Sequence, residues 1–354
     1  MVVAMSGGVD SSVAAALLVD QGHDVVGVTL HLWDYPDERS ARGRRAPEDL
    51  HDARRVADHL GIPHYSFDRR RLFAERVVEP FVDAYLSGET PSPCPLCNRS
   101  VKLAELLALA DRLGARKVAT GHYARIVDGQ GRVELHRGRD VAKDQSYFLH
   151  TLSEPTLARL VFPLGEMTKA EVRREAVRRG LPGAGKGESQ ELCFVPTGRY
   201  AAFVERRATG RIRAGRMLDA AGTVVAAHGG VHRFTIGQRR GLGVALGSPA
   251  FVVGIDPERA TVRLGSESDL LHTGAIVRGA RFFDDVAVRL RASVQVRYRH
   301  EGGLATITRE DGSATIRFDA PVRAIARGQA AVAYDGTRVL GGGTIDHVLR
   351  EVSP

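Results

Sequence analysis

Three cysteines lie in two short segments where thiol chemistry could take place. Cys94 and Cys97 form a C-x-x-C pair in TPSPCPLCNR, and Cys193 lies about 100 residues downstream in ESQELCFVP. A lone cysteine is usually a small buried apolar residue. A C-x-x-C where a loop meets a helix is different, because the helix N-terminus and the nearby Arg99 and Lys102 are expected to lower the thiol pKa. Three cysteines fit no disulfide framework, and they indicate a reducing compartment.

Two other uses of these cysteines remain open at this point. A structural zinc ion usually takes four ligands, and a histidine such as His122 would have to supply the fourth. A redox role like that of thioredoxin is disfavoured by the nucleotide-binding segment described next. We therefore treat the cysteines first as candidate sulfur carriers.

The segment SGGVDSS follows the first expected strand and precedes the first expected helix. Its small residues allow backbone N–H groups to close around an oxyanion, and the helix dipole adds to such a site. The P-loop pattern G-x-x-x-x-G-K-[ST] is absent from the sequence, which excludes that class of nucleotide site. SGGVDSS instead resembles the PP-loop of the N-type ATP pyrophosphatases, which split ATP between its α and β phosphates. The candidate ATP-binding residues in this segment are Ser6, Gly7, Gly8, Val9, Asp10, Ser11 and Ser12.

Alternating strand and helix patterns must position these residues. Such alternation predicts a doubly wound, mostly parallel sheet covered on both faces, with ligands at the carboxyl ends of the strands. The expected strands are 2–5, 25–32, 64–67 and 117–126. The expected helical segments are 11–21, 48–60, 69–87 and 100–113, with a Pro/Cys loop at 90–98 and an Arg-rich loop at 39–45.

Short β segments with Gly-rich turns replace this pattern after about residue 200. They lie at 213–218, 223–226, 249–255, 260–264, 292–298, 304–308, 314–318 and 330–340. We therefore expect an α/β domain over 1–198, a small central β-rich domain over 199–275, and a C-terminal β-barrel over 276–354.

Lysine and arginine outnumber aspartate and glutamate by 50 to 42, and the formal net charge of +8 favours a polyanionic partner. A basic, Arg-rich composition also follows from a GC-rich genome, so the charge alone does not decide. No apolar run approaches the length of a membrane span, and the start of the chain lacks the pattern of a signal peptide. We expect a cytoplasmic protein without a membrane partner.

A series of motifs, in this order along the chain, resembles the bacterial tRNA-specific 2-thiouridylases. They are SGGVDSS, PxPCxxCN, ATGHYAR, KDQSYFL, ESQELCF, FTIGQRRGLG, VRYRH, GQAAVAYDG and GGGTI. The resemblance covers nearly the whole chain. It implies a PP-loop domain joined to a small central domain and a C-terminal β-barrel, in agreement with the pattern of elements.

The resemblance also assigns roles to individual residues. Cys97 matches the family's nucleophile, and Cys193 matches the cysteine that carries the persulfide. The nucleotide loop would hold the pyrophosphate side of ATP, with Asp10 near Mg²⁺. The strand that ends at Leu30 and the loop at Gly121 would cradle the adenosine. Contacts with tRNA are implied for His122, Lys143, Asp144, Gln145, Arg297, Tyr298 and Gln329.

One position departs from the family pattern. Many members have Asn-Pro-Asp before the first cysteine, whereas this chain has Ser92-Pro93-Cys94. Either the missing aspartate is dispensable or Cys94 has a role of its own. As an alternative to the persulfide scheme, Cys94, Cys97 and Cys193 could ligate a [4Fe-4S] cluster that leaves one iron open to bind sulfide.

Chemistry explains why an ATP site and thiols would occur together. The C2 oxygen of uracil is a poor leaving group, and adenylation converts it into one. The implied partners are a tRNA with a wobble uridine, such as the lysine, glutamate and glutamine acceptors, and a persulfide or sulfide donor, with the enzyme a monomer. Two rival functions remain: an amidating PP-loop ligase and a non-catalytic RNA-binding protein with a relict nucleotide loop.

Arg297 and Arg299 are expected on one face of a strand, where they would follow the RNA backbone.

Overall fold

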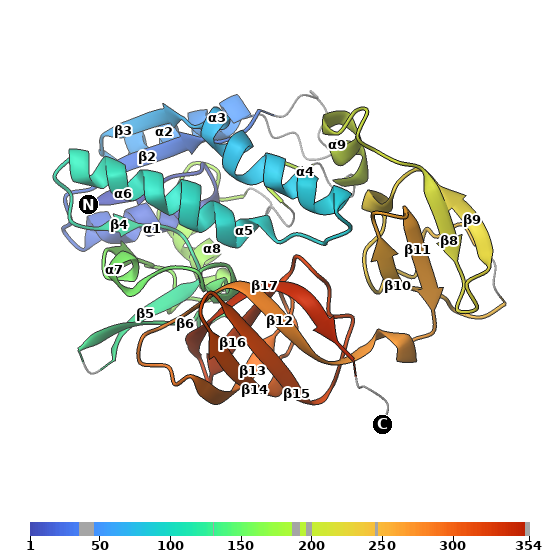
Figure 1. Cartoon of the computed structure of the whole chain (residues 1–354). Helices are drawn as coiled ribbons and strands as arrows, with labels where there is room; N and C mark the ends of the chain where they lie inside the picture. Colours follow the sequence, from blue (N-terminus) through green and yellow to red (C-terminus); the bar gives the residue numbers. More distant parts are fainter. Residues whose placement is uncertain (35–45, 130, 186–191, 196–199, 245–246, 351–354) are drawn as a thin grey trace. The chain divides into compact units, whose positions relative to one another are not determined.

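The computed structural model describes residues 1–34, 46–129, 131–185, 192–195, 200–244 and 247–350. The expected Arg-rich loop at 39–45 therefore lies outside the described residues. The chain divides into two compact units. Unit 1 comprises 1–77, 94–198 and 337–339, and unit 2 comprises 78–93, 199–336 and 340–354. Figure 1 shows the elements of both. In the described part of the chain, no helix combines the length and the apolar character that crossing a membrane requires.

A five-stranded parallel sheet forms the centre of unit 1, in the order β3-β2-β1-β4-β7. The expected α/β class and the parallel sheet are thus confirmed. Its strands are β1 (Val2–Ala4), β2 (Val26–His31), β3 (His64–Asp68), β4 (Val118–Ala119) and β7 (Leu160–Val161).

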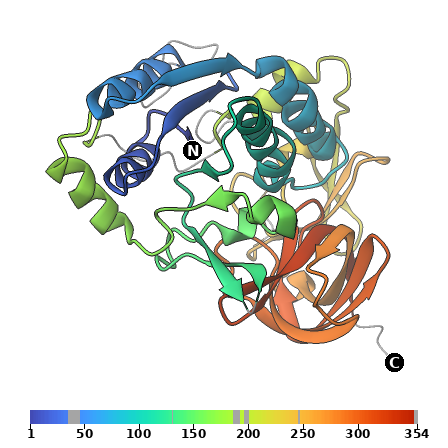
Figure 2. The same cartoon turned by 90° about the vertical axis from the view of Figure 1, so that its left-hand side faces the viewer.

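Helices lie on both faces of this sheet, as Figure 2 shows for α1 and α8 on one side and α6 on the other. The main helices of unit 1 are α1 (Val9–Asp20), α2 (Ala46–Leu60), α6 (Leu103–Arg112) and α8 (Lys169–Arg178), with the short α3 (Arg70–Phe73) and α7 (Glu154–Leu157). Helices α1 and α2 pack on the sheet through a cluster that includes Val3, Ala15, Leu18 and Val56. Burial of these apolar side chains is the main force that holds the layers together.

The cysteine segment at 90–98, expected to be a loop, is largely helical. Helix α5 (Pro93–Cys97) continues into a π-helical turn over Asn98–Lys102 and then into α6. Pro93 and Pro95 are tolerated because the first-turn N–H groups of a helix have no intrahelical partner to lose. The expected loop is therefore wrong, and Cys94 and Cys97 lie in the first turns of a continuous helical segment.

The expected strand over 117–126 is in fact two strands. Strand β4 ends at Ala119, and β5 (Ala124–Gly129) pairs in an antiparallel hairpin with β6 (Arg132–Arg137). Similarly, the expected helix over 69–87 consists of α3, a π-helical turn over Ala74–Val78, and α4 (Glu79–Leu86). The short 3-10 segment Ser146–Phe148 follows the hairpin.

Unit 2 contains α4 and α9 (Tyr200–Arg207), a four-stranded sheet and a closed barrel. The sheet has the order β10-β11-β8-β9, formed by β8 (Gly215–Leu218), β9 (Val224–His228), β10 (Phe251–Asp256) and β11 (Thr261–Gly265). The 3-10 segment Val231–Arg233 lies between β9 and β10, and Ser268–Leu270 leads from β11 into the barrel. A core that includes Met217, Val252, Val262 and Leu264 fills one face.

Six antiparallel strands form the barrel in the order β12-β15-β14-β13-β16-β17, and pairing of β12 with β17 closes it. The strands are β12 (Leu271–Phe282), β13 (Arg289–Gln295), β14 (Gly303–Glu310), β15 (Ser313–Arg323), β16 (Ala330–Asp335) and β17 (Arg338–Leu349). Closure removes the exposed sheet edges that would otherwise pair with other chains. The expected C-terminal β-barrel is confirmed, although the expected strand over 330–340 is two strands joined at Gly336.

Candidate active site

The nucleotide loop lies between the end of β1 and the start of α1, where the sequence predicts it. Gly8 is the N-cap of α1 and provides no side-chain cap. The first N–H groups of a helix have no intrahelical partner, so an uncapped terminus leaves them available to an anion. The Ser11 hydroxyl lies 3.1 Å from the Ser6 nitrogen and 2.9 Å from the Gly8 carbonyl oxygen, and the Ser12 hydroxyl donates to the same carbonyl at 3.0 Å. These bonds stabilise the curved backbone.

Two glycines allow the backbone around this loop to pack closely. Gly7 has φ +72°, and a Cβ atom there would overlap the backbone carbonyl of Asp49 in α2. Gly121, in the turn between β4 and β5, lies so close to the first turn of α1 that an added Cβ would be 2.9 Å from the Asp10 carbonyl carbon and 3.0 Å from the Ser11 nitrogen. The turn that carries Gly121 therefore rests directly on the nucleotide loop.

The Asp10 carboxylate bonds to two residues, Tyr123 and Lys169, that were not among the candidate site residues from the sequence. Its carboxylate accepts hydrogen bonds from the Tyr123 hydroxyl at 2.7 Å and from the Lys169 ammonium at 2.6 and 2.8 Å. Tyr123 belongs to the ATGHYAR motif, whereas Lys169 lies 159 residues away from Asp10 at the start of α8. The only sequence signal for Lys169 is its neighbour Thr168, which begins a T-x-x-E capping box with Glu171.

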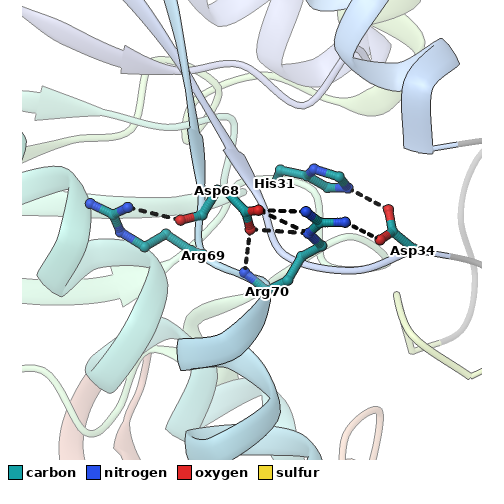
Figure 3. A network of polar contacts seen from close by, with 5 residues as sticks. All are labelled: His31, Asp34, Asp68, Arg69 and Arg70. Carbon is teal, nitrogen blue, oxygen red and sulfur yellow. Dashed lines mark hydrogen bonds and ion pairs between the residues drawn. The ribbon is translucent and has the colours of Figure 1, made fainter.

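Charged side chains also connect the carboxyl ends of β2 and β3, beyond Leu30 (Figure 3). His31 lies 2.8 Å from Asp34, and Arg70 bridges Asp34 to Asp68. The hydrogen bonds from Arg70 lower the pKa of the Asp68 and Asp34 carboxyls below their usual range. Sequence reasoning missed this network, which fixes the edge of the sheet beside which Leu30 was expected to cradle adenosine.

The three cysteines differ in exposure. Cys97 is buried, Cys94 is half-buried and Cys193 is exposed. The Asn98 amide, next to Cys97, donates to the Phe148 carbonyl at 3.2 Å and so ties the cysteine helix to the 3-10 segment. For Cys193, residues 192–195 are described, while the part of its motif over 186–191 lies outside the described residues.

Burial changes the expected thiol chemistry. It raises the pKa of Cys94 to about 12 and that of Cys97 to about 11, while the positive charge of Lys102 lowers both and a thiolate at Cys193 raises both. Lys102 therefore acts as the sequence predicts, but the expected net lowering of these two pKa values is wrong. The reason is that desolvation of the thiolate outweighs the attraction of one ammonium group.

This burial predicts how alkylation of Cys97 depends on pH. A thiol with a pKa of about 11 gains thiolate roughly tenfold per pH unit well below that pKa, so its rate of alkylation by iodoacetamide should rise steadily from pH 7 to 9. The Lys102→Met variant should react more slowly throughout. Peptide mass spectrometry measures the rates, with Tm as the control for folding. A plateau in the Cys97 rate below pH 9 would contradict this assignment.

Lys102 also lowers the pKa of His122, which follows Gly121 in the turn. Burial, together with the positive charge of Lys102, lowers the pKa of His122 to about 3, so the imidazole is neutral at physiological pH. Its Nδ1 lies 2.6 Å from the Thr120 hydroxyl. The turn over 120–123 thus contacts the nucleotide loop through Gly121, and its His122 lies within the electrostatic influence of Lys102.

Of the other residues with an implied tRNA contact, Asp144 and Gln145 make internal bonds in unit 1. The Asp144 carboxylate accepts from Arg137 at 2.9 Å, and also from the Gly138 and Ser146 backbones and the Ser146 hydroxyl. The side-chain amide oxygen of Gln145 accepts a hydrogen bond from the Tyr123 backbone N–H at 2.9 Å. Lys143, whose backbone N–H donates to the Asp140 carbonyl, is half-buried.

In unit 2, the expected arginine strand is wrong. Strand β13 ends at Gln295, and the next five residues form a turn in which Arg299 has φ +62°. The Arg297 guanidinium donates to the Arg323 carbonyl at 3.1 Å, and that of Arg299 lies 5.4 Å from the centre of the Tyr298 ring. Strand alternation therefore does not relate the two arginines.

Gln329 also has an internal partner, because its amide donates to the Thr90 carbonyl at 2.8 Å within unit 2. Backbone bonds from Thr90 to the Arg327 carbonyl and from Ser92 to the Gly328 carbonyl hold the same segment. This segment leads directly into Pro93, the first residue of α5.

The cysteines do not form a metal site in the arrangement seen here. Within the described ranges, no group of three or more His, Cys, Asp or Glu side chains is placed to hold a metal ion. Cys97 is buried and Cys94 half-buried, while Cys193 is exposed. The residues as arranged do not fit a [4Fe-4S] cluster or a zinc ion, and we derive no chemical step through either.

Comparisons with known proteins match three consecutive parts of the chain. Three family models match: the tRNA methyl transferase HUP domain over residues 1–197, the tRNA methyl transferase PRC-barrel domain over 201–266, and the aminomethyltransferase beta-barrel domain over 273–345.

Curated relatives match over nearly their whole length. A tRNA-specific 2-thiouridylase of Sorangium cellulosum is 62% identical, over 98% of this chain and 92% of the relative. Enzymes with the same description from Geobacter metallireducens and Syntrophotalea carbinolica are both 48% identical, with 98% or more of each chain covered. On the sequence identity and the nearly full-length match, this chain belongs to the family of tRNA-specific 2-thiouridylases.

Proposed function

We propose that this chain uses ATP to replace the C2 oxygen of uridine 34 in tRNA with sulfur, giving 2-thiouridine, AMP and pyrophosphate. Besides the family, one structural observation supports this proposal most directly. The turn over 120–123 contacts the nucleotide loop through Gly121. The positive charge of Lys102 lowers the pKa of His122 in this turn and also lowers the pKa of the Cys97 thiol. This arrangement supports an ATP site and a thiol site that are adjacent within unit 1, as a two-step reaction on one base requires.

In the first step the C2 oxygen attacks the α-phosphorus of ATP. The bond between the α-phosphorus and the bridging oxygen breaks, and its electron pair leaves with pyrophosphate. The uncapped N-terminus of α1 and the loop over residues 6–12 bind the phosphates, with Leu30 and Gly121 beside the adenosine. ATP enters as its magnesium complex, and the metal supplies charge neutralisation when bound.

The second step is sulfur transfer. The terminal sulfur of a persulfide on Cys193 attacks C2, and AMP leaves with the electron pair of the C2–O bond. The Cys97 thiolate then attacks the Cys193 sulfur, which leaves the transferred sulfur on C2 and forms a Cys97–Cys193 disulfide. Cellular thiols reduce this disulfide, and a persulfide donor such as a cysteine desulfurase or a sulfur relay protein recharges Cys193. Cys94 is an auxiliary thiol in this scheme.

The buried thiols and the neutral His122 suit a base that enters from the anticodon and displaces water. Chemistry on a base requires it to leave its stack. We therefore place the flipped uridine beside His122 and Cys97, with Lys143 and Gln145 on a loop that Asp144 holds in place. The acceptors are tRNAs for lysine, glutamate and glutamine, and the enzyme acts as a cytoplasmic monomer with domains over 1–198, 199–275 and 276–354.

Product analysis tests the proposal. The purified chain, unmodified tRNA, Mg-ATP and a persulfide donor should yield 2-thiouridine in the nucleoside digest, and omission of ATP should prevent this. Formation of an amidated nucleoside would favour the rival ligase. Binding of tRNA without any nucleotide turnover would favour a non-catalytic RNA-binding protein.

The turn after β13 predicts a specific salt effect. Arg299 is exposed and beside Tyr298, so it can contact an RNA phosphate, whereas the Arg297 guanidinium also donates to the Arg323 carbonyl at the end of β15. Loss of one phosphate contact should reduce the salt slope of log K by roughly 0.7 to 0.9. Arg299→Ala should show this reduction when tRNA binding is measured at several salt concentrations, and Arg297→Ala should add to it. Arg259→Ala is the control, because Arg259 is an exposed arginine in the turn between β10 and β11. Equal slopes for all variants would exclude an RNA contact at this turn.

A further inference from the structure

A PP-loop such as SGGVDSS contains no cation, although the group that leaves it is a pyrophosphate. The related phosphate-binding P-loop contains its own lysine, and this chain has none at the equivalent place. Oxyanions that form in a transition state are stabilised most by charges that are already in place. A cation supplied by another part of the chain would meet this need.

Lys169 is bonded directly to the nucleotide loop. Its ammonium contacts both carboxylate oxygens of Asp10, which lies in the first turn of α1 immediately after the N-cap Gly8. The Lys169 side chain is only 11% exposed, and that of Asp10 is 36% exposed. Asp10, in the nucleotide loop, is therefore the more exposed partner of this ion pair.

The position of the Lys169 ammonium group lowers the stability of the fold, which indicates a functional role beyond packing. It is the first residue of α8, where the helix dipole disfavours a positive charge. Burial of the ammonium adds a desolvation cost, and a buried ion pair is commonly no more stable than apolar residues of the same volume. Helices α1 and α8 already share an apolar contact through residues that include Val13, Ala16, Val172 and Ala176. Docking of α8 therefore needs no ion pair.

Several bonds fix the lysine in this unfavourable place. The Lys169 backbone N–H donates to Asp140 at 2.8 Å, and the capping box of Thr168 and Glu171 holds the start of α8. The Tyr123 hydroxyl donates to the same Asp10 oxygen that Lys169 contacts. A charge held from three sides changes little in position when a ligand binds, so it stabilises an oxyanion without reorganisation.

We infer that Lys169 is the cation of the nucleotide loop, which binds the β and γ phosphates of ATP and neutralises pyrophosphate as it leaves, and that Asp10 positions Lys169 instead of ligating magnesium. The inference deepens the proposed ATP-dependent adenylation and rests on it. In the step itself, the electron pair of the broken α–β bridge moves to the bridging oxygen of pyrophosphate. The ammonium group of Lys169 balances the new charge without a proton transfer.

The test compares Lys169→Met, Asp10→Asn and the double variant with wild type. Pyrophosphate release with tRNA is measured over a magnesium titration, binding of a non-hydrolysable ATP analogue is measured by calorimetry, and Tm reports folding. Each single variant should release pyrophosphate roughly 100-fold more slowly and bind the analogue more weakly. The double variant should be no worse than Lys169→Met, because two residues that act as one unit are not additive. The magnesium midpoint should stay at the wild-type value. Lys117→Met, which removes an ammonium bonded to the Ala158 carbonyl in the same unit, should behave as wild type.

Distinct outcomes overturn distinct claims. A magnesium midpoint at least tenfold higher in Asp10→Asn would make Asp10 a metal ligand and refute the inference. A Lys169→Met variant with a lower Tm but wild-type pyrophosphate release would make the pair structural only. The double variant leaves no unpaired buried charge and should therefore fold. Its rate of pyrophosphate release can be interpreted even where a single variant folds poorly. Failure of the wild-type chain to bind the analogue would instead refute the proposed function.

Discussion

Replacing Cys193 with serine is expected to abolish 2-thiouridine formation, because a serine hydroxyl cannot carry a transferable sulfur. The loss should exceed roughly a thousandfold, the scale typical of removing a covalent nucleophile. Pyrophosphate release during adenylation of the base should persist, since the nucleotide loop is untouched, whereas AMP should stay bound to the base because no sulfur displaces it. Cys97→Ser should also stop the reaction, but only after sulfur has displaced AMP, because the transferred sulfur would stay linked to Cys193. Mass spectrometry of the tRNA and of the Cys193 peptide distinguishes these two blocks.

Cys94 is the informative control for this prediction. Only the cluster alternative requires three cysteines together, whereas the persulfide scheme requires two. Cys94→Asp restores the aspartate found in many family members and should remain active with a persulfide donor. Chain purified without oxygen should contain no iron in amounts that track activity. Loss of iron and activity together in Cys94→Ser would refute the persulfide account.

Replacing Gly7 with alanine should disable the nucleotide loop. An alanine Cβ there would overlap the Asp49 carbonyl, and the left-handed backbone adds strain of about 1 kcal/mol. Relief of the overlap requires the loop or α2 to move, and a displacement of about 1 Å can reduce a rate roughly 100-fold. We therefore expect a loss of this size or more in tRNA-dependent pyrophosphate release.

Gly22 provides a matched control for that substitution. Its φ of +77° is close to that of Gly7, but nothing lies within 4 Å of an added Cβ. Gly22→Ala should therefore lower the free energy of unfolding by about 1 kcal/mol while pyrophosphate release stays near wild type. Equal activity of Gly7→Ala and Gly22→Ala would show that the close approach of the loop to α2 has no catalytic importance.

The sequence predicts those parts of the fold whose signals are local. The strand around Val28, the helix that Gly22 ends and the loop SGGVDSS each depend on apolar periodicity or on turn residues. The parallel sheet follows from their alternation. In the same way, repeated short β segments predict the barrel, although not the break at Gly336.

What the sequence does not predict depends on contacts between distant segments. Nothing near Lys169 shows that its ammonium reaches Asp10, because tertiary packing alone brings α8 to α1. The thiol pKa of Cys97 rises because folding removes the side chain from water, which outweighs the neighbouring Lys102 that the sequence displays. Residues around Tyr298 have strand-like composition, yet the ladder of β13 already ends at Gln295, and the following turn includes Arg299 with a left-handed backbone.

The most direct test of the account identifies the nucleotide products of one turnover. The chain is mixed with unmodified tRNA, radiolabelled Mg-ATP and a persulfide donor, and nucleotides and thiolated tRNA are counted in the same sample. We predict one AMP and one pyrophosphate for each 2-thiouridine formed, with neither product in the absence of tRNA. Formation of ADP and phosphate, or of 2-thiouridine without ATP consumption, would contradict the adenylation mechanism on which the whole account depends.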